Sequence, residues 1–439
     1  MVGLPALPPY WALGFQLSHS SYGSLEEAKA VVERNRAAGV PHDVLVLDTE
    51  SMFGHRDFTY DPEKFQNLPH FRDFLAAAGQ RLLLVLDAAI GAGPLPDGSP
   101  YGTFRRGAES RVWVNESDGA TPLIGRARAG RAQFPDFSSA PCRRWWEEEL
   151  RRFRRSVPFD GLELNCPTNL VPGSERGCAD NRWNFPPYSP ASFARPLFRR
   201  SLCPDAAHAW GRHYDVQNVY GHAMAMATHG ALQNISPGQR PLLVSGCTFP
   251  GSGRLGGRWG GAGPASWAGL REVLPDLLRS GLFGIPYSGS SICGGVGRGS
   301  EELCRRWHQL GAFLPLARNH NTEPGTAQDP AAFGAGSLLL NSTLAHLGTR
   351  FYAEEATWDV DAQFLWGEGL LITPVLEPGV EVIRAYIPDA VWYEYESGSR
   401  LWLRGQWTHL YLPGERLGLH LRGGRILPLQ DPAPTTAAR

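Results

Sequence analysis

Residues 159–169 read Phe159-Asp160-Gly161-Leu162-Glu163-Leu164-Asn165-Cys166-Pro167-Thr168-Asn169. The first half is typical of a short buried strand, with Leu162 and Leu164 on one face and Glu163 on the other, because side chains alternate along a strand. The second half consists mainly of polar and turn-forming residues. Barrels built of strand–helix units carry their catalytic carboxylates near the carboxyl ends of such strands. Glu163 is therefore the first candidate catalytic residue.

Strand-like and helix-like segments alternate on both sides of this stretch. Strands are expected at residues 11–17, 43–48, 81–87, 161–165, 241–247, 284–289 and 312–319, and helices at residues 25–38, 65–78, 145–153, 207–233, 266–278 and 301–310. Strands separated by helices predict an α/β fold with a parallel sheet. Seven or eight such units with polar strand ends predict a (β/α)8 TIM barrel. A dinucleotide-binding sheet is disfavoured because no G-x-G-x-x-G motif follows the first strand.

The pattern changes near residue 349. Short alternating segments follow at residues 380–387, 392–396, 401–403, 408–412 and 417–421, joined by Pro, Gly and Asp. They predict a small antiparallel β-sandwich domain. We therefore expect a barrel over residues 1–373, with insertions at 88–142 and 166–206, and a truncated β-domain over 374–439.

Composition excludes several classes of function. The net charge is −1, and the Arg-rich run at 143–155 carries Glu at helical spacing, which is typical of a solvated helix face and not of a nucleic-acid site. No apolar run approaches the roughly 20 residues of a membrane span. The first residues lack the basic region of a signal peptide. The seven cysteines show no zinc-site spacing, and neither a metal nor another cofactor is expected.

Eight motifs reveal a resemblance to a known family. They are PYWALGF (9–15), RDFT (56–59), FPDF (134–137), GSERGC (173–178), SEELC (300–304), RNHN (318–321), WGE (366–368) and LRGG (421–424). With them the chain resembles glycoside hydrolase family 31, and most of all its acid α-glucosidase members. The resemblance implies a retaining enzyme that releases terminal α-1,4-linked glucose from an α-glucoside or a glycogen-like oligosaccharide. It also implies a lysosomal or secretory location. Residues 321–357 are fewer than in the family pattern, so the eighth barrel unit is expected to be incomplete.

The resemblance also places the two catalytic positions. The family segment F-D-G-x-W-I-D-M-N-E-P-S-N is two residues longer than the stretch here, and alignment on its end puts Glu163 at the nucleophile position. The family's acid/base Asp aligns with Ala262. A merely structural role for Glu163 stays open as an alternative, because the deletion shortens the strand that presents it.

Substrate binding is implied for four further residues, Asp48, Asp87, Trp259 and His320. The alternatives are helix N-caps for the two aspartates and a structural histidine for His320. Four other sugar-binding positions of the family carry unrelated residues here, namely Arg128, Gly246, Ser291 and Gly295.

Cysteines support the secretory interpretation. The resemblance implies disulfides Cys178–Cys203 and Cys293–Cys304, which form in an oxidising compartment. It leaves Cys142, Cys166 and Cys247 as thiols. Glycosylation sequons at three asparagines, Asn115, Asn234 and Asn341, are consistent with a glycoprotein.

Three functions therefore compete: an active α-glucosidase, an inactive glycan-binding pseudoenzyme, and an incomplete form of an active enzyme. Ala262 cannot donate a proton, and a general acid typically contributes about 10²–10⁴ in rate. We therefore predict little or no glucosidase activity for this polypeptide.

Overall fold

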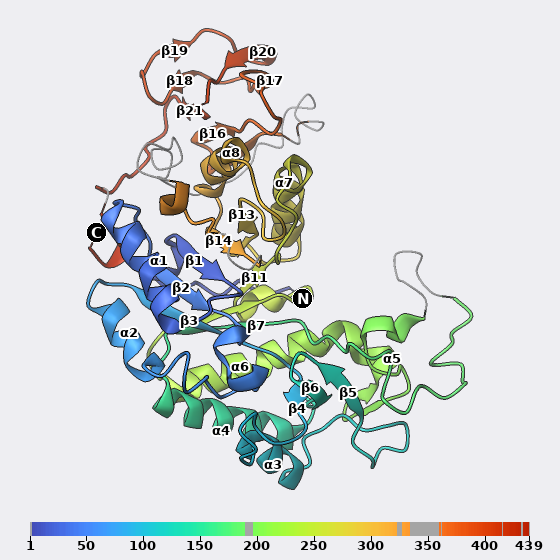
Figure 1. Ribbon diagram of the computed structural model, residues 1–439. Helices are drawn as coiled ribbons and strands as arrows, with labels where there is room; N and C mark the ends of the chain where they lie inside the picture. Colours follow the sequence, from blue (N-terminus) through green and yellow to red (C-terminus); the bar gives the residue numbers. More distant parts are fainter. Residues whose placement is uncertain are drawn as a thin grey trace.

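The computed structural model describes residues 2–188, 196–322, 327–333, 360, 362–414, 416–431 and 433–438 (Figure 1). Most of residues 321–357, together with the sequon at Asn341, lie outside this part of the chain.

Parallel strands form the barrel that the sequence predicts. The sheet order is β12-β11-β10-β7-β3-β2-β1-β14-β13. The strands are β1 (Gln16–His19), β2 (Val44–Leu47), β3 (Arg81–Leu86), β7 (Gly161–Leu164), β10 (Leu242–Ser245), β11 (Gly257–Trp259), β12 (Ser288–Gly289), β13 (Ser291–Ile292) and β14 (Arg318–Asn321). Only Ser290 separates β12 from β13, the two ends of the order, so they are two pieces of one strand that closes the barrel. Nine segments thus fill eight strand positions, and the α/β barrel fold is confirmed.

Helices surround the barrel (Figure 1). They are α1 (Leu25–Ala37), α2 (Leu68–Ala76), α4 (Ala140–Ser156), α6 (Tyr220–Ile235), α7 (Trp267–Leu282) and α8 (Glu301–Gly311). Serine N-caps begin four of them, at Ser24, Ser139, Ser266 and Ser300, and each hydroxyl accepts a hydrogen bond from the backbone N–H three residues later. Such a bond satisfies a donor that the first helical turn leaves free.

Strand β3 separates the two hydrophobic cores. Leu82, Leu84 and Leu86 pack outward into the large core between barrel and helices, whereas Leu83 and Val85 pack inside the barrel. A strand that is apolar on both faces is typical of a parallel sheet covered by helices.

The structure corrects three of the sequence-based boundaries. Residues 11–13, the start of the strand predicted at 11–17, lie in a 3-10 helix, η1 (Tyr10–Leu13), and the strand begins at Gln16. Strand β11 was not predicted, because three residues that include Gly257 and Arg258 carry no apolar run. The segment predicted as the seventh strand is β14, which takes the eighth position and pairs with β1. The eighth strand is thus present.

The insertions hold their own short elements. The first contains α3 (Gly102–Glu109) and the sheet of β4 (Ile90–Gly91), β6 (Gly130–Gln133) and β5 (Ile124–Ala127). After the second come the hairpin of β8 (Ala207–His208) and β9 (Gly211–Arg212) and the short α5 (His213–Val216). The helix predicted at 207–233 therefore begins only at Tyr220. Among the described residues, the remaining 3-10 helices are η2 (Thr49–Ser51), η3 (Phe53–His55), η4 (Leu197–Arg200), η5 (Gln217–Val219), η6 (Ser252–Arg254), η7 (Pro330–Phe333) and η10 (Thr436–Ala438).

The C-terminal region is antiparallel. One sheet has the order β15 (Phe364–Trp366), β16 (Leu370–Thr373), β21 (Gly418–Arg422), β18 (Trp392–Glu394) and β19 (Arg400–Leu401), and β17 (Val382–Ile387) pairs with β20 (Gln406–Tyr411). Because β15 pairs with β16, this sheet begins at Phe364, whereas the domain boundary at residue 374 stays a prediction. Within the described residues, no helix is both long and apolar enough to cross a membrane.

Candidate active site

Glu163 points into the barrel. Its neighbours Leu162 and Leu164 pack in the outer core, so the predicted alternation of this strand is correct. Glu163 is in register with Val85 of β3 and Val244 of β10, two residues of the inner core. The carboxylate thus lies one residue before the carboxyl end of β7, on the inner surface of the barrel.

An arginine that is distant in the sequence binds the Glu163 carboxylate. Arg318 of β14 donates a hydrogen bond from Nη1 to Glu163 Oε2, and the two side chains are only 1% and 6% exposed. Burial raises the pKa of Glu163, although the charge and hydrogen bond of Arg318 oppose that shift. Arg318 also donates to Gln16 Oε1 at 3.0 Å, and its guanidinium lies 4.4 Å from the ring centroid of Trp259. Sequence reasoning overlooked this role, although Arg318 opens the RNHN motif.

Two of the expected substrate-binding residues lie beside this ion pair. The rings of Trp259 and His320 meet edge to face, with centroids 6.0 Å apart. His320 Nδ1 is 2.7 Å from Ser18 Oγ. Burial lowers the pKa of His320 to about 3, so its imidazole is neutral at both lysosomal and neutral pH. The structure therefore brings Glu163, Trp259 and His320 together around Arg318.

The two aspartates follow neighbouring strands. Asp48 accepts a hydrogen bond from the Thr49 N–H at 2.7 Å and caps η2, as the structural alternative predicted. Its charge nevertheless contributes to raising the pKa of Glu163, behind burial, so the two carboxylates interact. Asp87 is bonded through its N–H to Asp57 Oδ1 at 2.9 Å, and burial raises the pKa of Asp87 to about 6. Burial and the charge of Asp87 raise the pKa of Asp57 well above its usual value.

Arg128 changes the rim of the site. It lies in the turn between β5 and β6, and its Nη1 is 3.1 Å from Thr49 Oγ1 and 3.4 Å from Glu50 Oε1. Burial and, to a smaller extent, the charge of Asp48 raise the pKa of Glu50 to about 7. The Arg128 cation thus lies beside these acidic residues and offsets part of their negative charge.

Small residues surround the expected acid/base position. Ala262 lies in the loop after β11, and a Cβ added at Gly295 would collide with the Ala262 Cβ. Ser291 Oγ donates to the Gly261 carbonyl at 3.1 Å. A methyl group neither gives nor takes a proton, so Ala262 itself supplies no acid or base.

The structure contains three disulfides. Two are those that the resemblance implies, Cys178–Cys203 and Cys293–Cys304. The third joins Cys166 to Cys247, so the expectation that these two are thiols is wrong. They follow the neighbouring strands β7 and β10, and this brings their Cα atoms to 5.1 Å despite a sequence separation of 81. Cys142 is a buried free thiol.

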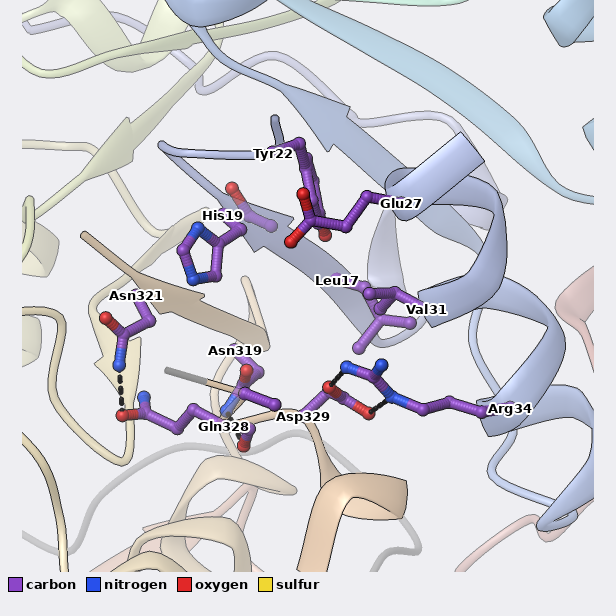
Figure 2. Close-up of a pocket in the computed structure, with 12 residues that line it drawn as sticks. Leu17, His19, Tyr22, Glu27, Val31, Arg34, Asn319, Asn321, Gln328 and Asp329 are labelled. Carbon is purple, nitrogen blue, oxygen red and sulfur yellow. Dashed lines mark hydrogen bonds and ion pairs between the residues drawn. The ribbon is translucent and has the colours of Figure 1, made fainter. Parts of the chain in front are cut away.

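A small pocket lies between α1 and the ends of β1 and β14 (Figure 2). Its volume is about 100 Å³, which is room for a few water molecules. Arg34 forms an ion pair with Asp329, and Asn321 Nδ2 donates to Gln328 Oε1 at 2.6 Å (Figure 2). These bonds attach residues 327–333 to the barrel, so we assign the pocket a structural role. Within the described residues, no cluster of three or more His, Cys, Asp or Glu could hold a metal ion.

Comparisons with known proteins agree with this geometry. The family model described as the glycosyl hydrolases family 31 TIM-barrel domain matches residues 5–349, and that of the glycosyl hydrolase family 31 C-terminal domain matches residues 341–427. Intestinal sucrase-isomaltase of Homo sapiens is 43% identical over 468 residues, which cover 100% of this chain and 26% of that protein. Lysosomal alpha-glucosidase of Mus musculus is 36% identical over 484 residues, which cover 99% of this chain and 50% of that protein.

A solved structure shares the fold. The ER glucosidase II complex of catalytic subunit and regulatory binding domain superimposes with a TM-score of 0.85 at 24% identity, over 99% of this chain and 48% of the matched one. The chain thus spans between a quarter and half of the relatives named here. Since the family's barrel model covers most of the chain and its C-terminal model most of the rest, the protein is a member of glycoside hydrolase family 31.

Proposed function

We propose that this chain binds α-glucosides of the type that α-glucosidases cleave, and that it hydrolyses them with strongly reduced activity. The observation that carries this proposal is the contrast between two positions. Glu163 lies inside the barrel with Arg318, Trp259 and His320, whereas the acid/base position holds Ala262. A nucleophile position with a carboxylate and an acid position without one predict that bond cleavage depends on the leaving group.

Each proposed role follows from the chemistry of its residue. Glu163 attacks the anomeric carbon as a carboxylate, and the Arg318 cation favours that ionised form. Asp48 and Asp87 accept hydrogen bonds from sugar hydroxyls, and Trp259 forms an apolar wall. Neutral His320 donates or accepts one hydrogen bond without adding charge. The missing general acid lowers the rate about 10²–10⁴-fold for substrates with a poor leaving group.

A fluorogenic α-glucoside tests this proposal, measured near pH 4.5 and pH 7 with and without azide. Its leaving group needs no proton, and azide can replace water as the second nucleophile. We expect slow turnover that azide accelerates and that Glu163→Gln abolishes. Ala262→Asp should extend activity to maltose, whose leaving group needs an acid. Fast maltose hydrolysis by the unaltered chain, undiminished in Glu163→Gln, would contradict the proposal.

A non-catalytic glycan-binding role is the second candidate. It is favoured by the same ion pair, because a carboxylate that is held by a buried arginine is less available to attack an anomeric carbon. Calorimetric binding of maltose without turnover of the fluorogenic substrate, with or without azide, would support this role. Absence of both binding and turnover would speak against both candidates.

A lysosomal or secretory location fits the same proposal. Three disulfides require an oxidising compartment during folding. Asn234, one of the described sequon residues, is exposed, and its Nδ2 donates a hydrogen bond to Glu147 Oε2 at 3.0 Å that glycosylation would have to replace. Peptide mapping after expression in a secretory host tests this, with an N-linked glycan at Asn234 as the expected result.

A further inference from the structure

Four polar side chains form a hydrogen-bonded chain outside the barrel interior. Ser201 Oγ lies 2.7 Å from His213 Nε2, and His213 Nδ1 lies 3.1 Å from His208 Nε2. His208 Nδ1 in turn lies 3.4 Å from Asp136 Oδ1. These contacts join Ser201 of the second insertion, His208 of the β8–β9 hairpin and His213 of α5 to the FPDF motif, which lies much earlier in the sequence.

The hydrogen bonds of this chain run in one direction. Burial alone would raise the pKa of Asp136, but hydrogen bonds from His208 and Ser138 lower it, so Asp136 is a carboxylate that can only accept. His208 must then donate through Nδ1, which leaves its Nε2 to accept from His213. Burial lowers the pKa of His213, so its ring is neutral, and because its Nδ1 donates to His208, its Nε2 accepts from the Ser201 hydroxyl.

A cavity of about 430 Å³ gives a substrate access to this serine. Ser201 and His213 both line it, and Ser201 is half-buried where it does so. Phe134 and Tyr220 provide apolar walls, and the side chains of Gln217 and Asn218 contribute amide groups. This volume is large enough for a small organic molecule, and its lining combines apolar surface with hydrogen-bond donors.

We propose that Ser201 is the nucleophile of a second hydrolytic site, which cleaves esters of short carboxylic acids. A hydroxyl becomes a nucleophile when an adjacent base takes its proton and a third group orients that base. His213 is that base, and its ring is oriented toward Ser201 by His208, which Asp136 orients in turn. Gln217, Asn218 and Arg258 are among the residues that line the cavity, and their side chains carry donors of the kind that can bind an oxyanion.

The reaction uses water as its only co-reactant. Ser201 Oγ forms a bond to the carbonyl carbon while its proton passes to His213 Nε2. The bond from carbon to the alkoxy oxygen then breaks, and His213 returns the proton to the leaving alcohol. Water attacks the acyl-serine, gives one proton to His213, and releases the acid as Ser201 regains its proton.

Labelling of the full chain with a fluorophosphonate probe tests the nucleophile directly. We expect the phosphonyl group on the peptide that contains Ser201, identified by mass spectrometry, and no labelling at this peptide in Ser201→Ala. Hydrolysis of p-nitrophenyl acetate should fall on the order of a hundredfold or more in Ser201→Ala. The matched control is Ser174→Ala, which removes a serine of the same insertion that bonds the Gly177 carbonyl and no histidine.

The orienting role of His208 has a separate readout. A cysteine at the nucleophile position, Ser201→Cys, should react with iodoacetamide at a lower pH than an unperturbed thiol, and adding His208→Ala should shift that reactivity back toward higher pH. Each variant is compared with the unaltered chain by circular dichroism. A folded chain that carries no label at Ser201, or whose esterase rate is the same in Ser201→Ala, overturns the proposal.

Discussion

Arg318 offers the sharpest test of the interior of the barrel. Substitution Arg318→Met keeps the length and apolar stem of the side chain but removes the cation that pairs with Glu163. Because the side chains are 1% and 6% exposed, the remaining carboxylate stays in an apolar environment without a partner. Breaking a buried pair in this way typically destabilises a protein by about 3–5 kcal/mol. We expect a loss of that size at pH 8.

The loss should depend on pH in a defined direction. The folded-state pKa of Glu163 is already raised, so stability from this group is greatest at low pH and declines as the pH rises through the folded-state pKa. Removal of Arg318 raises that pKa further. Each additional pKa unit destabilises the fold by about 1.4 kcal/mol above the new pKa. Arg318→Met should therefore be closer to the unaltered chain at pH 5, where Glu163 can bind a proton, than at pH 8.

Urea unfolding, followed by tryptophan fluorescence at pH 5 and pH 8, measures both effects. Arg306→Met is the matched control, because Arg306 is also buried but donates to the carbonyls of Leu412 at 3.0 Å and Arg416 at 2.9 Å. The loss of stability caused by Arg306→Met should be similar at both pH values. The double variant Arg318→Met/Glu163→Leu should recover most of the stability, since apolar replacement of a buried pair is often close to neutral. Equal destabilisation by Arg318→Met at both pH values would refute the reasoning.

Three further outcomes are expected. Replacement of Cys166 and Cys247 by Ser should lower the free energy of unfolding by about 2–5 kcal/mol. Non-reducing peptide mapping of the unaltered chain should yield two peptides linked through these cysteines. Separate peptides would contradict the pairing. Thr228→Val removes the acceptor of the buried Trp146 Nε1–H at 2.9 Å and should lower stability by about 1–3 kcal/mol, whereas an unchanged unfolding midpoint would argue against this bond. Asp57→Asn should stabilise the chain more at pH 8 than at pH 5. Burial and the charge of Asp87 raise the pKa of Asp57, so ionisation of Asp57 weakens the fold as the pH rises. A stability change that is the same at both pH values would exclude this electrostatic cause.

Local patterns predicted the fold better than they predicted its details. The continuous apolar run at residues 81–87 identified a strand covered on both faces, and the structure places it in the barrel as β3. Strand β11 was missed because its few residues include a glycine and an arginine, and it is held by its neighbours and not by its own propensity. The same reason explains η1, where an aromatic and apolar run resembled a strand but lies before the barrel begins.

For the candidate site, the sequence predicted correctly only those properties that depend on a single residue or on its immediate neighbours. Ala262 cannot act as an acid in any fold. The alternation around Glu163 also determined by itself that the carboxylate faces away from Leu162 and Leu164. The tertiary structure alone decided which groups meet that carboxylate. Arg318 is 155 residues away in the sequence, and it reaches Glu163 because both side chains point into one closed barrel.

The same distinction holds for the cysteines and for the serine–histidine chain. The sequence determined that residues 166 and 247 are cysteines near the ends of two successive strands, but it left their side-chain positions open. The register of β7 against β10 and the path of the two loops place the thiols within bonding reach. Ser201, His213 and Asp136 lie outside the strands, so no strand period orients them; they meet His208 because the second insertion and the residues after it pack against the FPDF segment, which only the tertiary structure decides.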